Sequence, residues 1–88
     1  MYKTQFVVTF EQGAARLVRG HAPQRFVSAC SDIARLYGIE RGRVECQTRG
    51  AKARLKFSKE IPERARQPIR NVWTPPTSPD RGGSRARG

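Results

Sequence analysis

Alternating apolar and polar positions near the start of the chain predict a β-hairpin. Over residues 4–10 the apolar side chains of one parity are Phe6, Val8 and Phe10, a spacing typical of a strand with one buried face. Glu11-Gln12-Gly13 predicts a turn, because glycine readily adopts a positive φ. A second strand is expected over about residues 14–19, where it would pair with the first.

The apolar positions that follow have helical spacing. Pro23 suits the first turn of a helix, and Gly38 suits the position just after its last turn. Ile39 would then be the hydrophobic residue that commonly accompanies a glycine stop. The apolar stripe between these ends consists of Phe26, Cys30, Ile33 and Tyr37, with Ala29 and Leu36 beside it.

A second strand pair and a second helix are expected in the remainder. Strands at about 43–48 and 52–57 would flank a turn at Arg49-Gly50. Pro62 then opens a helix, and Pro68 lies inside it. Because proline lacks a backbone N–H, we expect Pro68 to kink this helix or to split it in two. Its apolar residues are Ile61, Ala65, Ile69, Val72 and Trp73.

The two halves of the chain resemble each other in sequence. Residues 13–17 read Gly-Ala-Ala-Arg-Leu, and residues 50–55 read Gly-Ala-Lys-Ala-Arg-Leu, with one residue inserted. Downstream, Pro-Gln-Arg at 23–25 matches Pro-Glu-Arg at 62–64. The matches fall in the same order within the same expected elements. The sequence therefore predicts a duplicated ββα unit.

The expected fold class is α+β, with a ββα-ββα order, a four-stranded antiparallel sheet and both helices on one face. We assign residues 1–73 to a single domain and residues 74–88, which are rich in Pro, Gly and Arg, to a disordered tail. The expected core consists of Phe6, Val8, Phe10, Leu17, Phe26, Cys30, Ile33, Val44, Cys46, Leu55, Phe57, Ile69 and Trp73.

Positive charge is concentrated in the second half of the chain. The formal net charge is +11, and residues 41–70 contain ten Lys and Arg against three Glu. Strand alternation places part of this charge on the sheet face opposite the helices. The side chains expected there are Gln5, Val7, Thr9, Arg16, Val18, Arg43, Glu45, Gln47, Lys52, Arg54 and Lys56.

A cationic sheet face of this kind is typical of a protein that binds a polyanion. Nucleic acid is the expected partner, with Arg16, Arg43, Lys52, Arg54 and Lys56 as the binding residues. The tail would assist through Arg81, Arg85 and Arg87, since Arg81-Gly82-Gly83 resembles segments that bind single strands. The same charges would also discourage self-association of the sheet, so solubility is an alternative role.

Aromatic side chains for base stacking are scarce on the expected open face. Sheets that read single-stranded RNA present aromatics there, whereas the Phe, Trp and Tyr residues of this chain are assigned to the buried face or to a helix. Tyr2 is the exception. We therefore expect contacts with phosphates rather than bases, and little sequence specificity.

Catalysis is not predicted. His21 is the sole histidine, and the chain contains no nucleophile elbow and no phosphate-binding glycine loop. Two cysteines and one histidine are too few for a four-ligand zinc site, so no metal or cofactor is expected. Cys30 and Cys46 fall on apolar positions and are expected to be free and buried. A disulfide between them is the alternative, and a reducing compartment disfavours it. Without a targeting or membrane-spanning segment, the expected location is the cytoplasm.

Three short segments carry a resemblance to a known family. They are Val18-Arg19-Gly20, Ile33-Ala34-Arg35, and Ile61-Pro62-Glu63 with the Arg70-Asn71-Val72-Trp73 ending. Together they are similar to a small bacterial family of unknown function, over about residues 5–73. The resemblance implies a bacterial origin and a similar fold, and it implies no activity or site.

Two functions are consistent with these features. The first is a non-catalytic basic module that binds nucleic-acid phosphates. The second is a protein-interaction or assembly module, either a homodimer or an adaptor, because a folded region of about 70 residues buries a small core and gains from a partner.

Overall fold

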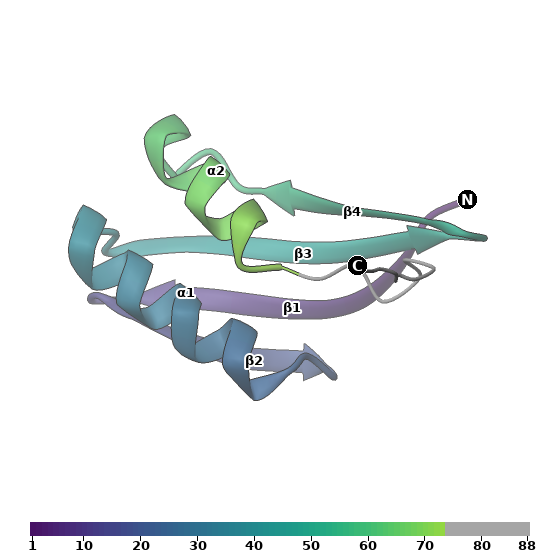
Figure 1. Ribbon diagram of the computed structural model, residues 1–88, viewed down its shortest axis with the longest axis horizontal. Helices are drawn as coiled ribbons and strands as arrows, with labels where there is room; N and C mark the ends of the chain where they lie inside the picture. The colour runs from purple at the N-terminus through teal and green to yellow at the C-terminus, as the bar shows by residue number, and fades with distance from the viewer. Residues whose placement is uncertain (74–88) are drawn as a thin grey trace, which may run out of the picture.

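The computed structural model of the chain describes residues 1–73. Six elements follow one another along it in a β-β-α-β-β-α order (Figure 1). They are β1 (Lys3–Glu11), β2 (Ala14–Gly20), α1 (Gln24–Tyr37), β3 (Arg41–Arg49), β4 (Lys52–Phe57) and α2 (Glu63–Asn71).

The four strands form one antiparallel sheet in the order β2-β1-β3-β4. A two-residue turn joins the strands of each hairpin, since Glu11 pairs with Ala14 and Arg49 pairs with Lys52. The pairing of β1 with β3 joins the two hairpins, so the first strand of each half lies in the centre of the sheet and the second lies at an edge.

Both helices cover the same face of this sheet (Figure 1). Phe6, Val8 and Phe10 of β1 lie beneath them, with Val44 and Cys46 of β3. The helices contribute Phe26, Cys30, Ile33 and Ala34 from α1 and Ala65 and Ile69 from α2. The predicted α+β fold with a four-stranded antiparallel sheet and two helices is therefore confirmed.

Helix α1 begins and ends where the sequence predicts. Pro23 precedes its first residue with an extended backbone, and Gly38 follows its last with φ 67° and ψ 37°. The Ile39 N–H donates to the Ala34 carbonyl at 2.8 Å, and the Ile39 side chain is buried. The hydrophobic residue after the glycine stop thus returns the chain to the core.

Helix α2 runs through Pro68 as one helix and is not split. Proline at this position removes the N–H that would pair with the Arg64 carbonyl. Arg64 is exposed, so water can hydrate that carbonyl. The helix spans nine residues only, and its buried side, with Ala65 and Ile69, holds it against the core.

The core differs from the predicted set at its margins. Leu17, Leu55, Phe57 and Trp73 are partly buried and pack against it. Ala34, Ile39, Ile61 and Ala65 are additional buried members. Two apolar residues expected on the helix stripes, Leu36 and Val72, are instead 78% and 37% exposed. Leu36 lies in the last turn of α1, and Val72 directly follows α2.

Two irregularities shift the strand alternation. Val7 lies opposite Arg19 and Val8 lies opposite Leu17, which leaves Val18 as an extra residue in β2. Similarly, Thr4 lies opposite Gln47 and Phe6 opposite Cys46, which leaves Gln5 as an extra residue in β1. Such bulges change which side chain reaches a given face.

A serine of α1 hydrogen-bonds to the outer edge of β2. The Ala15 N–H donates to Ser31 Oγ at 2.8 Å, and Ser31 Oγ donates to the Ala15 carbonyl at 3.2 Å. An edge strand otherwise presents unpaired backbone groups to other chains. Ser31 therefore occupies one pair of these groups within the fold.

The backbone approach at Gly20 predicts a large loss of stability in Gly20→Ala. Gly20 has φ +75°, and a Cβ there would overlap the Gln5 carbonyl oxygen and lie 2.9 Å from Phe6 Cα. Gly50→Ala is the matched control, because Gly50 has φ +59° but no atom within 4 Å of its Cβ position. We expect a loss of about 1 kcal/mol for Gly50→Ala and roughly 2 to 4 kcal/mol for Gly20→Ala in urea unfolding. Equal losses would contradict the packing argument.

The buried thiols predict a loss of stability at alkaline pH. Burial raises the pKa of Cys30 from 9.0 to about 12 and that of Cys46 to about 11, because a thiolate loses its hydration in the core. Below pH 9 both the folded and unfolded states keep these protons. Above it the unfolded chain releases protons that the folded chain retains, so the free energy of unfolding decreases with rising pH.

Urea unfolding between pH 8 and 11 measures this effect. The limiting slope is about 1.4 kcal/mol per pH unit for each thiol. The Cys30→Ala variant is expected to show a shallower decline than the parent chain, whatever its stability at pH 7. Parallel declines in the two chains would show that other groups cause the alkaline loss.

Candidate nucleic-acid interface

The sheet face opposite the helices, here called the open face, is strongly cationic. Residues directly opposite on neighbouring antiparallel strands point to the same side, so the register identifies its members. They include two carboxylates, Glu11 and Glu45, and eight exposed cations: Arg16, Arg19, Arg41, Arg43, Arg49, Lys52, Arg54 and Lys56.

The five strand residues predicted as binding residues all lie on this face. Arg16 is on β2, Arg43 is on β3, and Lys52, Arg54 and Lys56 form one row along β4, here called the β4 row. The other three predicted residues, Arg81, Arg85 and Arg87, lie outside the described residues. The structure therefore brings together the strand part of the predicted site.

Three further cations of the open face were not predicted. Arg19 reaches it because the extra residue at Val18 shifts the alternation of β2. Arg41 and Arg49 reach it because β3 extends beyond residues 43–48 at both ends. The sequence did contain a signal for Arg41 and Arg49, because both are separated from Arg43 by an even number of positions and so point to the same face of a regular strand. No comparable signal identifies the bulge at Val18.

Val7 is the apolar centre of the open face. It lies opposite Arg19 on one side and Glu45 on the other, and it is buried although it lies outside the core cluster. The aliphatic portions of long charged side chains commonly cover such a residue. Val7 is therefore a small apolar patch within a mostly polar face.

The two carboxylates neutralise only part of the charge. Glu11 lies 3.7 Å from Arg16, and Glu45 Oε2 lies 3.8 Å from Arg43 Nε. Within residues 1–73, no ion pair within 4 Å involves the other six cations of this face. The β4 row is therefore available to an external anion.

A chain of hydrogen bonds connects the middle of the open face. Gln47 Nε2 donates to Glu45 Oε1 at 3.1 Å, and Arg54 Nε donates to Gln47 Oε1 at 3.0 Å. The Arg54 guanidinium also lies over the ring of Tyr2, 3.8 Å from its centroid. Arg54 is thus held in position although it is exposed.

Acidic residues collect at one end of the sheet. Glu11 ends β1, and Glu40 and Glu60 lie beside the start of β3, where they help to line two neighbouring hollows. The pKa of Glu60 is lowered, first by a hydrogen bond from Ser58, then by its own backbone N–H and the charges of Lys59 and Arg41. The opposite end, with Arg49, Lys52 and Arg54, is the cationic end.

Some cations in the second half of the chain have a structural role. Arg66 donates to the carbonyls of Ile61 at 3.1 Å and Ser58 at 3.3 Å. Arg66 and Arg70 also lie over the ring of Phe57, at 5.5 and 4.9 Å from its centroid. These two arginines hold α2 and its preceding loop on the sheet, on the side of the helices.

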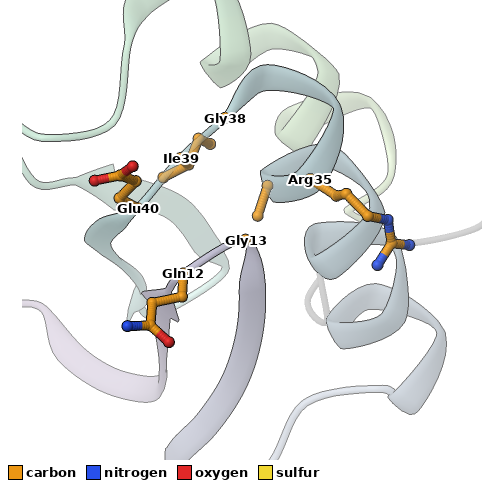
Figure 2. A pocket seen from close by; sticks show the side chains of 7 residues that line it. Gln12, Gly13, Arg35, Gly38, Ile39 and Glu40 are labelled. Carbon is orange, nitrogen blue, oxygen red and sulfur yellow. The ribbon is translucent and has the colours of Figure 1, made fainter.

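The hollow shown in Figure 2 lies between the β1–β2 turn and the C-terminal end of α1, with a volume of about 410 Å³. Its backbone donors are occupied, since the Gln12 and Gly13 N–H groups donate to the carbonyls of Glu40 at 2.8 Å and Ile39 at 3.1 Å. Arg35 points away from Gln12 and Glu40 (Figure 2) and pairs with Asp32 at 2.8 Å. This hollow offers a ligand no converging charges.

Cys30 and Cys46 are free thiols in the core. Within residues 1–73, no three side chains among His, Cys, Asp and Glu gather closely enough to hold a metal ion. No helix of the described part combines the length and apolar character that crossing a membrane requires.

Comparison with known proteins places the chain in a family. No curated protein and no solved structure matches it. The family model described as "Protein of unknown function (DUF3634)" matches residues 2–87, which agrees with the resemblance to a small family of unknown function. The chain therefore belongs to the DUF3634 family of unknown function.

Proposed function

We propose that this protein is a non-catalytic basic module whose open face binds the phosphate backbone of a nucleic acid. The observation that carries the proposal is the arrangement of eight exposed cations and two carboxylates on one uncovered sheet face of the described chain. Phosphate contacts of this kind supply affinity without reading sequence.

The β4 row is the centre of the proposed interface. Its three side chains lie on alternate residues of one strand, so they project to the same side at a spacing of roughly 6.7 Å. Arg49 lies opposite Lys52 and adds to the row at the cationic end. Arg16 and Arg43 have a secondary role in this proposal, because each has a carboxylate nearby.

Two further parts of the proposal concern origin and location. The strand order supports descent of the two halves from one ββα unit, because it places β1 and β3 at the centre and β2 and β4 at the edges. The bacterial cytoplasm is the proposed location, on the strength of the sequence expectation.

A salt titration tests the proposed interface. If about five phosphates are neutralised, the logarithm of the association constant should fall against that of salt concentration with a slope of about −4.5 on random duplex DNA and about −3.5 on single strands. Lys52→Gln combined with Lys56→Gln should reduce the slope by about 2 and weaken binding equally on unrelated sequences.

The matched control is Arg25→Gln combined with Arg64→Gln. It removes the same charge from exposed positions of α1 and α2, on the helix side of the sheet, and should leave most of the affinity. Equal losses in the two double variants would argue against a defined interface. Absence of binding by the parent chain at 50 mM salt would overturn the proposal itself.

Assembly into a homodimer is the second candidate, and the exposure of Leu36 favours it. Leu36 is 78% exposed on α1, on the side of the molecule that the open face does not use. Self-pairing of β4 is disfavoured, because antiparallel copies would place the β4 row against itself.

Light scattering across protein concentrations separates this candidate from the first. A dimer through α1 should dissociate in Leu36→Glu and persist in Arg54→Glu combined with Lys56→Glu. An association free energy of about 8 kcal/mol corresponds to a dissociation constant of about 1 μM. A parent chain that stays monomeric up to about 100 μM would therefore remove this candidate.

A further inference from the structure

Arg54 differs from the other cations of the open face in how it is held. Its guanidinium carbon lies 3.8 Å from the centroid of the Tyr2 ring, and its Nε donates to Gln47 at 3.0 Å. Gln47 is in turn fixed by its bond to Glu45. An arginine fixed in this way presents a planar group at a defined place, whereas Lys52 and Lys56 beside it are point charges.

One side of this planar group faces Tyr2. The other side belongs to an exposed residue on an uncovered sheet face, so a second flat group can stack there. Unpaired bases stack on aromatic rings and on arginine planes. In a duplex the faces of the bases are covered by their neighbours, and only the edges and phosphates can be reached.

We propose that Arg54, supported by Tyr2, is a stacking site for one unpaired base, so that the open face prefers single-stranded nucleic acid to duplex. This inference rests on the proposed function and names its substrate class. Lys52 and Lys56, two residues to either side on β4, would contact the phosphates that flank the stacked base. Stacking accepts any base, which agrees with weak sequence specificity.

Three labelled probes of equal length test the inference by fluorescence anisotropy at one salt concentration. They are a single-stranded 12-mer, the same 12-mer as duplex, and an abasic 12-mer that retains the phosphates and lacks the bases. The full chain with an untagged N-terminus is required, because Tyr2 lies next to it. We expect the single strand to bind at least about fivefold more tightly than the abasic strand.

Two variants separate stacking from charge. Arg54→Lys keeps the charge and removes the plane, and Tyr2→Leu keeps Arg54 and its bond to Gln47 but removes the ring. Both should reduce the single-strand preference over the abasic strand to less than about twofold, with affinity for the abasic strand retained. Arg25→Lys is the matched control, because it makes the same exchange at an exposed position of α1 outside the open face, and it should keep the full preference. Circular dichroism spectra and melting temperatures establish that all three variants are folded.

The outcomes distinguish the two proposals. Equal binding of the single, abasic and duplex probes, with the salt dependence intact, would overturn the stacking site and leave the phosphate interface. A preference that survives in both Arg54→Lys and Tyr2→Leu would also overturn it. Failure of all three probes to bind at low salt would instead overturn the proposed function.

Discussion

The antiparallel pairing of β1 with β3 is the constraint on which the rest of the structure depends. It joins the two hairpins, and its register places Val8 opposite Val44 and Phe6 opposite Cys46 on the covered side. The same register sends Val7 and Glu45 to the other side. A slip of one residue would exchange the two faces, burying charge and exposing the core. The apolar core therefore fixes where the cations lie.

The repulsion between cations of the open face is small compared with the stabilisation that the core provides. Two unit charges about 6.7 Å apart on one strand repel by roughly 0.6 kcal/mol in water, and salt screens them further. Burying one core side chain such as Phe10 contributes about 1.5 to 3 kcal/mol. A few exposed like-charge pairs thus cost about as much as one buried residue contributes. Binding a polyanion would remove that repulsion.

Strand and helix positions could be predicted because the spacing of apolar residues agrees with the Pro and Gly residues that mark the ends of the elements. Phe6, Val8 and Phe10 identify β1, and Pro23 and Gly38 delimit α1. The β4 row could be predicted because β4 alternates without a bulge. Arg19 could not, since the bulge that brings it to the open face is a feature of the pairing between β2 and β1, which the alternation of β2 alone does not report. Ile61 was missed from the core for a related reason: it lies in a loop, and it fills the space that Gly42 leaves without a side chain.

The placement of the acids decides which part of the open face can meet a polyanion. Glu11, Glu40 and Glu60 lie toward the end where β3 begins, and Glu45 is already engaged by Arg43 and Gln47. The same end carries Arg16, Arg41 and Arg43, so its carboxylates offset only part of the positive charge. At the other end, Arg49 and Lys52 lie opposite each other with no acid of the open face beside them, and a phosphate chain would be attracted more strongly there. Because the two ends of the face differ in how far acids offset the positive charge, a bound strand would have a preferred position along it. Arg54, held between Gln47 and Tyr2 near that end, is the residue at which an unpaired base is proposed to stack.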